Sequence, residues 1–226
     1  CSQSRGLGDV YKRQTGAVIG FIFAVNTEIP IYGFICAAIA GALLSVLFAV
    51  LTQYIMSNQV ATGLGLTMVG LGLSALIGKP YEGIRSPTLS KIEIPILSDI
   101  PILGPMIFSH DAIVYFSVIL VATVAFVISK TRIGLVLRAV GENQEAAHAL
   151  GYKVVRIRFL AIMFGGATAG IGGAYISLAR VPQWTEGMTA GAGWIALALV
   201  VFASWKPWRV LLGAYLFGGI TVLQLN

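Results

Sequence analysis

The longest uncharged stretch of this sequence runs from Ile29 to Gly78, where fifty consecutive residues include no Asp, Glu, Lys or Arg. A helix of that length would extend about 75 Å, whereas a hydrocarbon core is roughly 30 Å thick and is crossed by about 20 residues. The stretch therefore has to contain two membrane crossings. A polar break near residues 53–59 divides it into two predicted spans, 30–53 and 60–78.

Apolar stretches of similar character recur along the rest of the chain. Only 11% of the residues are charged, against about 25% in soluble domains. Because lipid offers no water to unpaired backbone groups, such stretches are predicted to be helical. The sequence predicts an all-α, polytopic transmembrane helical bundle with about seven membrane segments, and it excludes a soluble monomer, a disordered chain and a disulfide-stapled secreted domain. The remaining predicted segments are 15–25, 111–129, 159–180, 191–205 and 210–225.

The first fourteen residues, CSQSRGLGDVYKRQ, differ from the rest of the chain because they are polar and carry no helical stripe. They fit either a cytosolic tail or a non-native remnant joined to an incomplete chain, and we favour the remnant. The predicted organisation is therefore a non-native or disordered tail at 1–14 and a transmembrane domain at 15–226.

The distribution of charge predicts the orientation of the spans. Segment 130–158 contains six Lys or Arg residues against two Glu, and Lys206 and Arg209 form a second basic loop two predicted spans later. Loop 79–111 is mixed, with three basic and four acidic residues. Since basic loops favour the cytoplasmic side, we expect 130–158 in the cytoplasm and 79–110 outside. Basic charge at a membrane surface is ordinary, so no nucleic-acid partner is expected.

Glycine is enriched inside the predicted spans, with 27 glycines in 226 residues. Segments 63–72 and 165–173 hold many of them, and Gly166 and Gly170 form a GxxxG pair. In lipid, small residues allow helix backbones to approach closely. Tight helix packing accounts for most of these glycines, while a helix that bends beside a substrate path is a second interpretation for 63–72.

The residue patterns of enzymes are missing from the sequence. No HExxH, GxSxG or paired Cys–His motif occurs, so we predict no catalytic residue and no metal site. No ionisable side chain falls in the middle of a predicted span, which disfavours a proton-coupled carrier and an intramembrane enzyme. Gly78–Lys79 lacks the glycine spacing and the following hydroxyl of an ATP-binding loop. Any ATP-driven function would need an ATPase on another polypeptide.

A short helix is predicted in the cytoplasmic segment ENQEAAHALG, residues 142–151. Asn143 can cap its start, Glu145 suits its first turn and Gly151 can end it. The alanines leave a slim surface that the groove of another protein could accept. An amphipathic helix resting on the membrane surface is an equal alternative.

The stretch LRAVGENQEAAHALG resembles the cytoplasmic coupling segment of bacterial ABC-transporter permeases of the ribose and branched-chain amino-acid superfamily. Other stretches are similar to its simple-sugar and nucleoside uptake branch: SNQVATGLGLTMVGLGLSALIGK, LSDIPILGPMIFSHDAIVY, GMTAGAGWIALALVVFASWKP and LLGAYLFGGITVLQL. The resemblance covers about residues 16–226. Family members are longer at both ends, so 15–226 is expected to be an incomplete permease domain.

This resemblance implies a multi-pass permease subunit of an ABC importer in the bacterial cytoplasmic (inner) membrane, translocating nucleosides or related simple sugars. The implied partners are a second permease subunit, a cytosolic ABC ATPase and an extracytoplasmic substrate-binding protein. The resemblance implies no enzymatic activity and no cofactor in this chain, because ATP is bound and hydrolysed by the partner. The implied ATPase-coupling residues are Gly141, Glu142, Asn143, Ala146, Ala147 and Gly151.

Substrate contacts are expected by position at Asn58, Gln59, Thr62, Thr67 and Trp194. For each of them, packing or interhelical hydrogen bonding is an equal interpretation. The proline-rich loop 79–110 is expected to pack on the external membrane face, where a binding protein could dock, and a merely structural lid is an equal interpretation. The alternative to the ABC permease is a self-contained secondary carrier or channel for a small polar solute.

Overall fold

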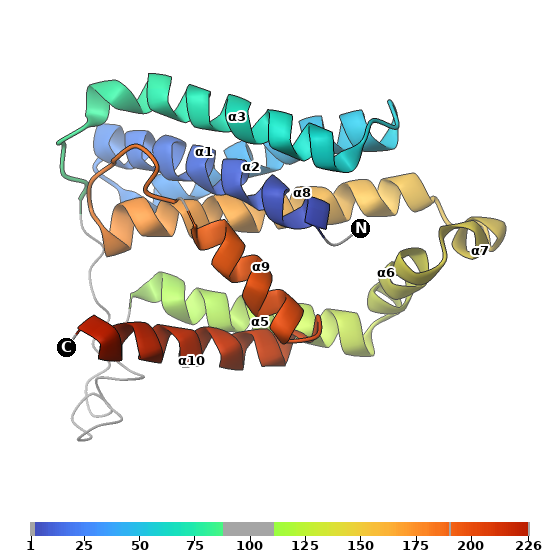
Figure 1. The fold of residues 1–226 in the computed structure, drawn as a ribbon. Coiled ribbons are helices and arrows are strands. Elements are labelled where there is room, and N and C mark those ends of the chain that lie inside the picture. The colour runs from blue at the N-terminus through green and yellow to red at the C-terminus, as the bar shows by residue number, and fades with distance from the viewer. Residues whose placement is uncertain (1–2, 88–110, 190, 226) are drawn as a thin grey trace. The chain divides into compact units, whose positions relative to one another are not determined.

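The computed structural model describes residues 3–87, 111–189 and 191–225 of the chain. The part that it describes is helical and contains no β-strand, and isolated bridges join Glu82 to Trp184 and Arg85 to Gln183 (Figure 1). The predicted all-α fold is thereby confirmed. Most of the external loop predicted at 79–110, from residue 88 onward, lies outside the described residues.

The chain divides into two compact units. Unit 1 comprises Cys1–Thr88 and Glu145–Leu197, and unit 2 comprises Leu89–Gln144 and Ala198–Asn226. The helices of unit 1 are α1 (Gln3–Thr27), α2 (Pro30–Gln53), α3 (Gln59–Gly78), the 3₁₀ helix η1 (Lys79–Tyr81), α8 (Val154–Tyr175) and the π-helix η2 (Ile176–Arg180). Unit 2 contains α5 (Ala112–Lys130), α6 (Arg132–Glu142) and α10 (Pro207–Leu225). Helices α7 (Gln144–Ala149) and α9 (Ala192–Phe202) cross from one unit into the other.

Four of these helical segments are long and apolar enough to cross a membrane, so the chain is a multi-pass integral membrane protein. They are α2, α3 with η1, α5, and α8 with η2. The expected total of about seven membrane segments is not confirmed. Helix α9 has 11 residues and extends only about 16 Å, too little to cross the bilayer alone. Helix α10 covers the predicted segment 210–225 but is not among the four.

The N-terminal helix extends further than the sequence predicted. The expected segment 15–25 lies within α1, which begins at Gln3 and so includes residues predicted to form a tail. Tyr11 and Gln14 on this helix are buried. The separate origin of residues 1–14 stays a prediction.

Local signals explain where α2 and α3 begin and end. Pro30 stands at the start of α2, where a missing amide donor costs nothing. The Asn58 side chain caps α3 by accepting hydrogen bonds from the backbone amides of Val60 and Ala61, at 2.9 and 3.4 Å. Between the two helices, Met56 adopts φ +53°, which breaks the helical path. Helix α3 then runs unbroken to Gly78, so the glycines of 63–72 do not interrupt it.

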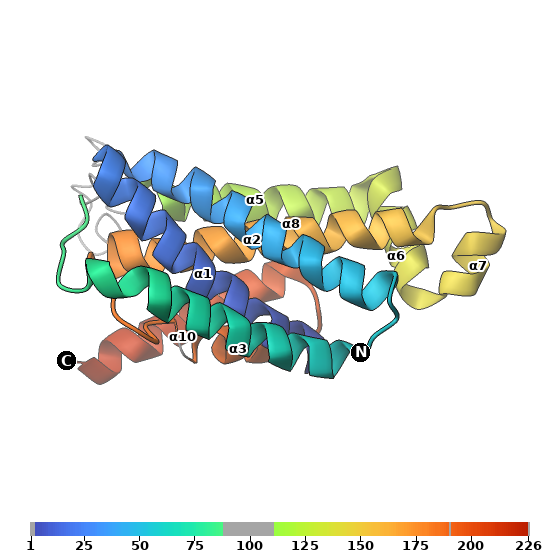
Figure 2. The same ribbon diagram turned by 90° about the horizontal axis from the view of Figure 1, so that it is seen from above.

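Glycines hold α1, α2 and α8 together at backbone contact. A Cβ atom on Gly16 would lie 2.5 Å from the carbonyl oxygen of Gly170, and one on Gly170 would lie 3.0 Å from the carbonyl carbon of Ala37. A Cβ on Gly166 would meet the Ser45 side chain, whose Cβ would be 2.6 Å away. The packing role predicted for Gly166 and Gly170 is confirmed. In the view from above, α1 lies between α2 and α3 (Figure 2).

Candidate functional site

The segment predicted to couple to an ATPase forms a short helix, α7. Asn143 stands just before its first residue with extended backbone angles, φ −143° and ψ 107°. Glu145 lies in its first turn and His148 in its last turn. Gly151, at φ +84°, donates its amide to the carbonyl of His148 at 2.9 Å and ends the helix. The predicted short helix is confirmed, although it covers Gln144–Ala149 rather than the whole of 142–151.

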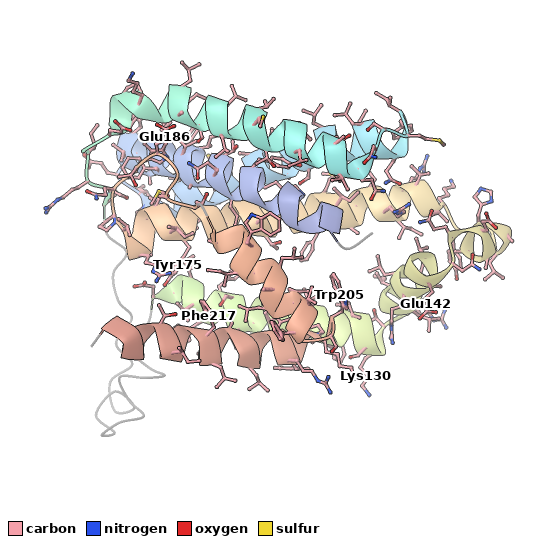
Figure 3. All side chains as sticks on the ribbon, viewed as in Figure 1. Lys130, Glu142, Tyr175, Glu186, Trp205 and Phe217 are labelled. Carbon is pink, nitrogen blue, oxygen red and sulfur yellow. The ribbon has the colours of Figure 1, made fainter. Side chains whose placement is uncertain are left out.

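The candidate coupling residues divide into an exposed set and one buried residue. Ala147 is only 1% exposed, so its methyl group packs within the protein. Ala146 on the same helix is exposed. Glu142, labelled in Figure 3, lies at the end of α6 and is exposed, as are Gly141, Asn143 and Gly151. Ala146 is therefore accessible from outside the protein, whereas Ala147 is covered.

Helix α6 precedes this segment and folds back against the end of α5. The Thr131 side chain caps α6 by accepting a hydrogen bond from the Gly134 amide at 3.3 Å. Gly134 allows the close approach, since a Cβ there would lie 2.5 Å from the Cα of Ile128. Arg138 donates from Nη2 to the carbonyl oxygen of Ile128 at 2.6 Å. The α5–α6 connection is thus a defined turn that fixes a basic side chain at the end of a membrane-spanning helix.

Three of the five residues expected to contact substrate lie together at the start of α3. Asn58 is the cap, Gln59 is the first helical residue and Thr62 follows in the first turn. The hydroxyl groups of Thr62 and Ser57 are hydrogen-bonded at 2.8 Å. Thr67 lies further along α3 and donates to the carbonyl of Gly63 at 2.7 Å. These two hydrogen bonds lie at the start of α3 or within it, so a role of these residues in substrate binding stays a prediction.

Trp194, the fifth expected residue, belongs to α9 rather than α3. Its side chain is 54% exposed. The backbone carbonyl of Ala192, at the start of this helix, accepts a hydrogen bond from Arg13 Nη1 at 3.1 Å. Trp194 therefore lies on an exposed face of a short helix, and its contact with substrate also stays a prediction.

The sequence did not single out Trp184, which is fully buried at one end of unit 1. Its indole ring covers Gly78, where a Cβ would lie 2.5 Å from the Cζ2 atom of the ring. The Ser86 amide donates to the carbonyl oxygen of Pro182 at 3.0 Å, which ties the segment after α8 to the segment after α3. The sequence signal for this contact was Gly78, the last residue of the predicted span 60–78, because a glycine there leaves room for a large ring.

Buried hydroxyl groups in unit 1 mostly bond within their own helices. Ser45 donates to Gly41 at 2.8 Å and Ser74 to Leu71 at 3.2 Å. Ser177 in the π-helix also bonds across helices, donating to the carbonyl oxygen of Ala17 at 2.9 Å. Within the described ranges, no cluster of His, Cys, Asp and Glu could hold a metal ion. What the arrangement offers is a membrane-embedded scaffold with hydroxyl and indole groups at buried positions.

The curated relatives of this chain include ABC transporter permeases. It is 39% identical over 215 residues to a putative glucose ABC transporter permease protein of Haloferax volcanii, an alignment that covers 93% of this chain and 65% of the relative. It is 32% identical over 221 residues to the nucleoside ABC transporter permease protein of Lactococcus lactis, covering 93% and 70%. It is 34% identical over 199 residues to the guanosine ABC transporter permease protein of Bacillus subtilis, covering 84% and 61%.

These matches set the extent of the resemblance. The chain spans 65%, 70% and 61% of the lengths of the three relatives. No solved structure matches it. The resemblance to the simple-sugar and nucleoside branch of ABC permeases is confirmed. Residues 14–226 match the family described as the permease component of branched-chain amino acid transport systems, and the chain belongs to that family.

Proposed function

We propose that this chain is the membrane-spanning permease subunit of an ABC importer that translocates nucleosides or related simple sugars. The observation that carries the proposal is its similarity, over 84% to 93% of its length, to permeases named for glucose, nucleosides and guanosine. In this proposal the chain lies in the bacterial inner membrane and carries no cofactor or catalytic activity. A cytosolic ABC ATPase binds and hydrolyses ATP, a second permease subunit pairs with the chain, and an extracytoplasmic binding protein delivers the solute.

The decisive experiment is reconstitution of the full-length permease with its candidate ATPase and second permease in vesicles. We expect uptake of labelled guanosine or glucose only when ATP is supplied on the cytosolic side. Uptake by the permease alone, unaffected by ATP, would instead support the secondary carrier or channel. Co-purification of the ATPase with the permease is the accompanying binding measurement.

The proposed topology places 130–158 in the cytoplasm and 79–110 outside, and the connectivity of unit 1 supports the part of it that puts α7 and the start of loop 79–110 on opposite sides of the membrane. Together α8 and η2 have 27 residues and extend about 40 Å, enough to cross the bilayer. Helix α7 precedes this segment, whereas residues 182–184 come after it and contact the residues just after α3. The coupling helix and the start of loop 79–110 thus belong to opposite ends of one membrane-spanning helix.

Cysteine labelling tests this topology in a background that lacks Cys1 and Cys36. Glu82 and Gln144 suit the purpose, because Glu82 is exposed just after α3 and Gln144 is exposed at the start of α7. We expect an impermeant thiol reagent to label the Glu82→Cys variant in intact cells and to label Gln144→Cys only after the membrane is opened. The reverse pattern would overturn the orientation.

We further propose that α7 and the residues beside it dock into a groove of the ATPase. The surface for docking includes Ala146, since its methyl group is exposed, while Ala147 faces inward. The discriminating variant is therefore Ala146→Glu, because Ala147→Glu would disturb α7 itself. An unpaired charge in a buried contact costs about 3–5 kcal/mol, so ATPase association should weaken by about a hundredfold or more.

The control for the fold of this segment is Gln144→Glu, which adds the same charge in the first turn of α7. A negative charge is favourable at a helix N-terminus, so this variant should keep its structure. The measurement is pull-down of the ATPase beside solute uptake. A helix that only rests on the membrane surface would leave pull-down by Ala146→Glu unchanged, and that result would reject the docking role.

The proposed solute path includes Asn58, Gln59, Thr62, Thr67 and Trp194. Replacing Thr67 by Val removes its hydroxyl, which we expect to raise the KM for solute uptake several-fold if this group contacts solute. Thr52→Val on α2 is the matched control, because the Thr52 hydroxyl likewise donates to its own helix, to Phe48 at 2.8 Å. Equal effects of the two variants on KM would reject a solute contact at Thr67.

The boundaries proposed for the domain rest on the family match, which covers residues 14–226. We propose that residues 15–226 form a permease domain incomplete at both ends and that residues 1–14 lie outside it, a boundary one residue after the start of the family match. Mass spectrometry of the protein from its natural source would test this assignment, because native protein carrying CSQSRGLGDVYKRQ would contradict it.

A further inference from the structure

The segment after α8 turns back onto α3 and buries a tryptophan there. The π-helix η2 ends the membrane-spanning segment, with the Val181 amide bonded to the carbonyl of Ile176 at 2.9 Å. Beyond it the chain is not helical, and its exposed residue Glu186 is labelled in Figure 3. Trp184 in this segment is completely buried. Irregular backbone beside a membrane span is tolerated where it is buried in protein or lines a water-filled passage.

The Trp184 ring lies against Gly78, in a position that only glycine permits and that we call the Trp184 seat. A Cβ on Gly78 would lie 2.5 Å from Cζ2 and 2.6 Å from Cε2 and Cη2 of the ring. The seat is at the end of α3, because Gly78 is the last residue of that helix. The ring therefore closes the end of α3 by contact with bare backbone, without a side chain to hold it.

The indole Nε1–H of Trp184 is buried and has no hydrogen-bond partner among the described residues. Buried tryptophan N–H groups usually find a partner, because an unmet donor keeps the full cost of leaving water. Exceptions in folded proteins call for a specific explanation, and one explanation is a functional role. A donor at this place would be satisfied by a solute hydroxyl or by water entering at the end of α3.

A second unpartnered group, on α1, lies opposite the same face of α3 and further inward. The face of α3 that carries Gly78 also carries Ser74 and Gly70, and all three are buried. The Thr15 hydroxyl on α1 lies 3.5 Å from the position of a Cβ on Gly70, and it too is buried with no hydrogen-bond partner in the described part of the chain. From Gly70 to Gly78 the helix rises about 12 Å. We name this strip, from Thr15 and Gly70 through Ser74 to Gly78 and Trp184, the α1–α3 seam.

We propose that the α1–α3 seam is a route for the solute and that Trp184 closes its outer end and donates Nε1–H to the entering solute. This inference rests on the proposed function. Nucleosides and sugars carry both hydroxyl groups and an apolar face, which suit an indole that offers a ring and one donor. Glycine and serine on this face of α3 leave its backbone close to the seam, and Tyr11 of α1, which is fully buried, packs against Gly70 there.

The closure is connected to the external side of the proposed topology. Trp184 pairs with Glu82 and Gln183 pairs with Arg85 as isolated bridges. Residues 82–85 begin the loop that is proposed to face the binding protein. A movement of residues 82–85 would therefore act directly on the backbone of Trp184.

The test measures access to Ser74, one helical turn inward from the Trp184 seat and 1% exposed. The reporter is Ser74→Cys in the full-length permease without Cys1 and Cys36, treated from outside with an impermeant thiol reagent. We expect slow labelling in this background and at least tenfold faster labelling when Trp184→Ala or Gly78→Ala is added. Trp184→Phe should keep labelling slow, because a phenyl ring still fills the seat.

Gly72→Ala is the matched control, since a Cβ there meets nothing within 4 Å on the same helix. It should leave labelling unchanged. Gly78→Ala keeps the proposal testable if Trp184→Ala fails to assemble, which size-exclusion elution would reveal. Unchanged labelling of the reporter in assembled Gly78→Ala or Trp184→Ala protein would overturn the closure.

Solute contact is measured separately, in the otherwise unaltered transporter. Trp184→Phe should raise the KM for guanosine or glucose uptake about fivefold, the equivalent of one ordinary hydrogen bond, and leave kcat nearly unchanged. An unchanged KM would overturn the solute contact. The labelling needs neither ATP nor uptake. A transporter that moves neither solute would therefore reject the proposed function, and the labelling would still decide whether Trp184 closes the seam.

Discussion

Helices α8 and α3 are both rich in glycine, but their glycines face different neighbours. On α8, a Cβ on Gly170 would meet the backbone of Ala37, and one on Gly173 would lie 3.0 Å from the backbone nitrogen of Ala17. On α3, a Cβ on Gly78 would meet the Trp184 side chain, while Gly65 has nothing within 4 Å. The packed-face glycines Gly170 and Gly173 of α8 thus meet backbone, whereas Gly78 of α3 meets a side chain, and each helix also carries glycines on an open face, such as Gly172 and Gly65.

Backbone contacts and side-chain contacts should differ in how far they allow the helices to move. Lipid chains are as apolar as leucine, so membrane helices associate through close packing and interhelical hydrogen bonds rather than through the hydrophobic effect. A backbone contact cannot yield without moving a whole helix, whereas a side chain can rotate. We therefore expect α1, α2 and α8 to move as one body and the contacts of α3 to change more readily.

The largest effect is expected from filling the backbone contact of α8. In Gly170→Val the new side chain would have to displace α2, because the carbonyl carbon of Ala37 would lie 3.0 Å from the first added atom. We expect a loss of more than about 3 kcal/mol in the free energy of unfolding, which would appear as loss of monodisperse protein in detergent. Gly172→Val is the control on the same helix, because its Cβ meets nothing within 4 Å. Similar losses in both variants would contradict the comparison.

A smaller effect is expected at the side-chain contact of α3. Gly78→Ala displaces the Trp184 ring but no backbone, so we expect a loss of about 1–2 kcal/mol, typical of an overpacked site that can adjust. The measurement is the thermal midpoint in detergent beside that of Gly170→Ala. If Gly78→Ala proved the more damaging of the two, α3 would be the rigid element and the comparison would be reversed.

The sequence predicted these two helices with different success. The predicted spans 30–53 and 60–78 match α2 and α3 almost to the residue, because long uncharged stretches and a polar break are local signals. The GxxxG pair at Gly166 and Gly170 indicated packing, which the structure confirms. A glycine count could not show that Gly65 faces open space while Gly78 receives a ring, since that depends on elements distant in the chain.

The candidate site could likewise be predicted from the sequence only where the signals are local. Helix α7 could be predicted because Asn143 and Gly151 mark its two ends within a few residues. The burial of Ala147 could not, because an alanine carries no sign of which side faces the protein. Trp184 was missed for a related reason: its seat on Gly78 joins residues about a hundred positions apart, and no local pattern encodes such a contact.

A third effect, smaller again, is expected from the hydrogen bond between η2 and α1. Ser177→Ala removes the donor to the carbonyl oxygen of Ala17, 2.9 Å away. Interhelical hydrogen bonds in membrane proteins contribute about 0.6 kcal/mol on average, so we expect a loss of that order. Thr168→Val is the control, because its hydroxyl donates to Phe164 and Gly165 of its own helix. A loss in the control as large as in Ser177→Ala would show that the bond to α1 adds nothing.

The smallest effect is expected on the open face of α3, where Gly65→Ala should not destabilise the protein. Nothing lies within 4 Å of the added methyl group, so no contact has to move. Alanine restricts the unfolded chain more than glycine and favours helix, which in exposed helices of soluble proteins stabilises by about 0.5–1 kcal/mol. In the bilayer the unfolded state is already largely helical, so we expect the thermal midpoint of the isolated subunit to stay unchanged or rise slightly. Gly70→Ala, on the opposite face, should lower it, because a Cβ there would lie 2.6 Å from the Cβ of Tyr11. A clear loss of stability in Gly65→Ala would mean that this face is packed within the subunit, and the distinction between the two faces of α3 would then fail.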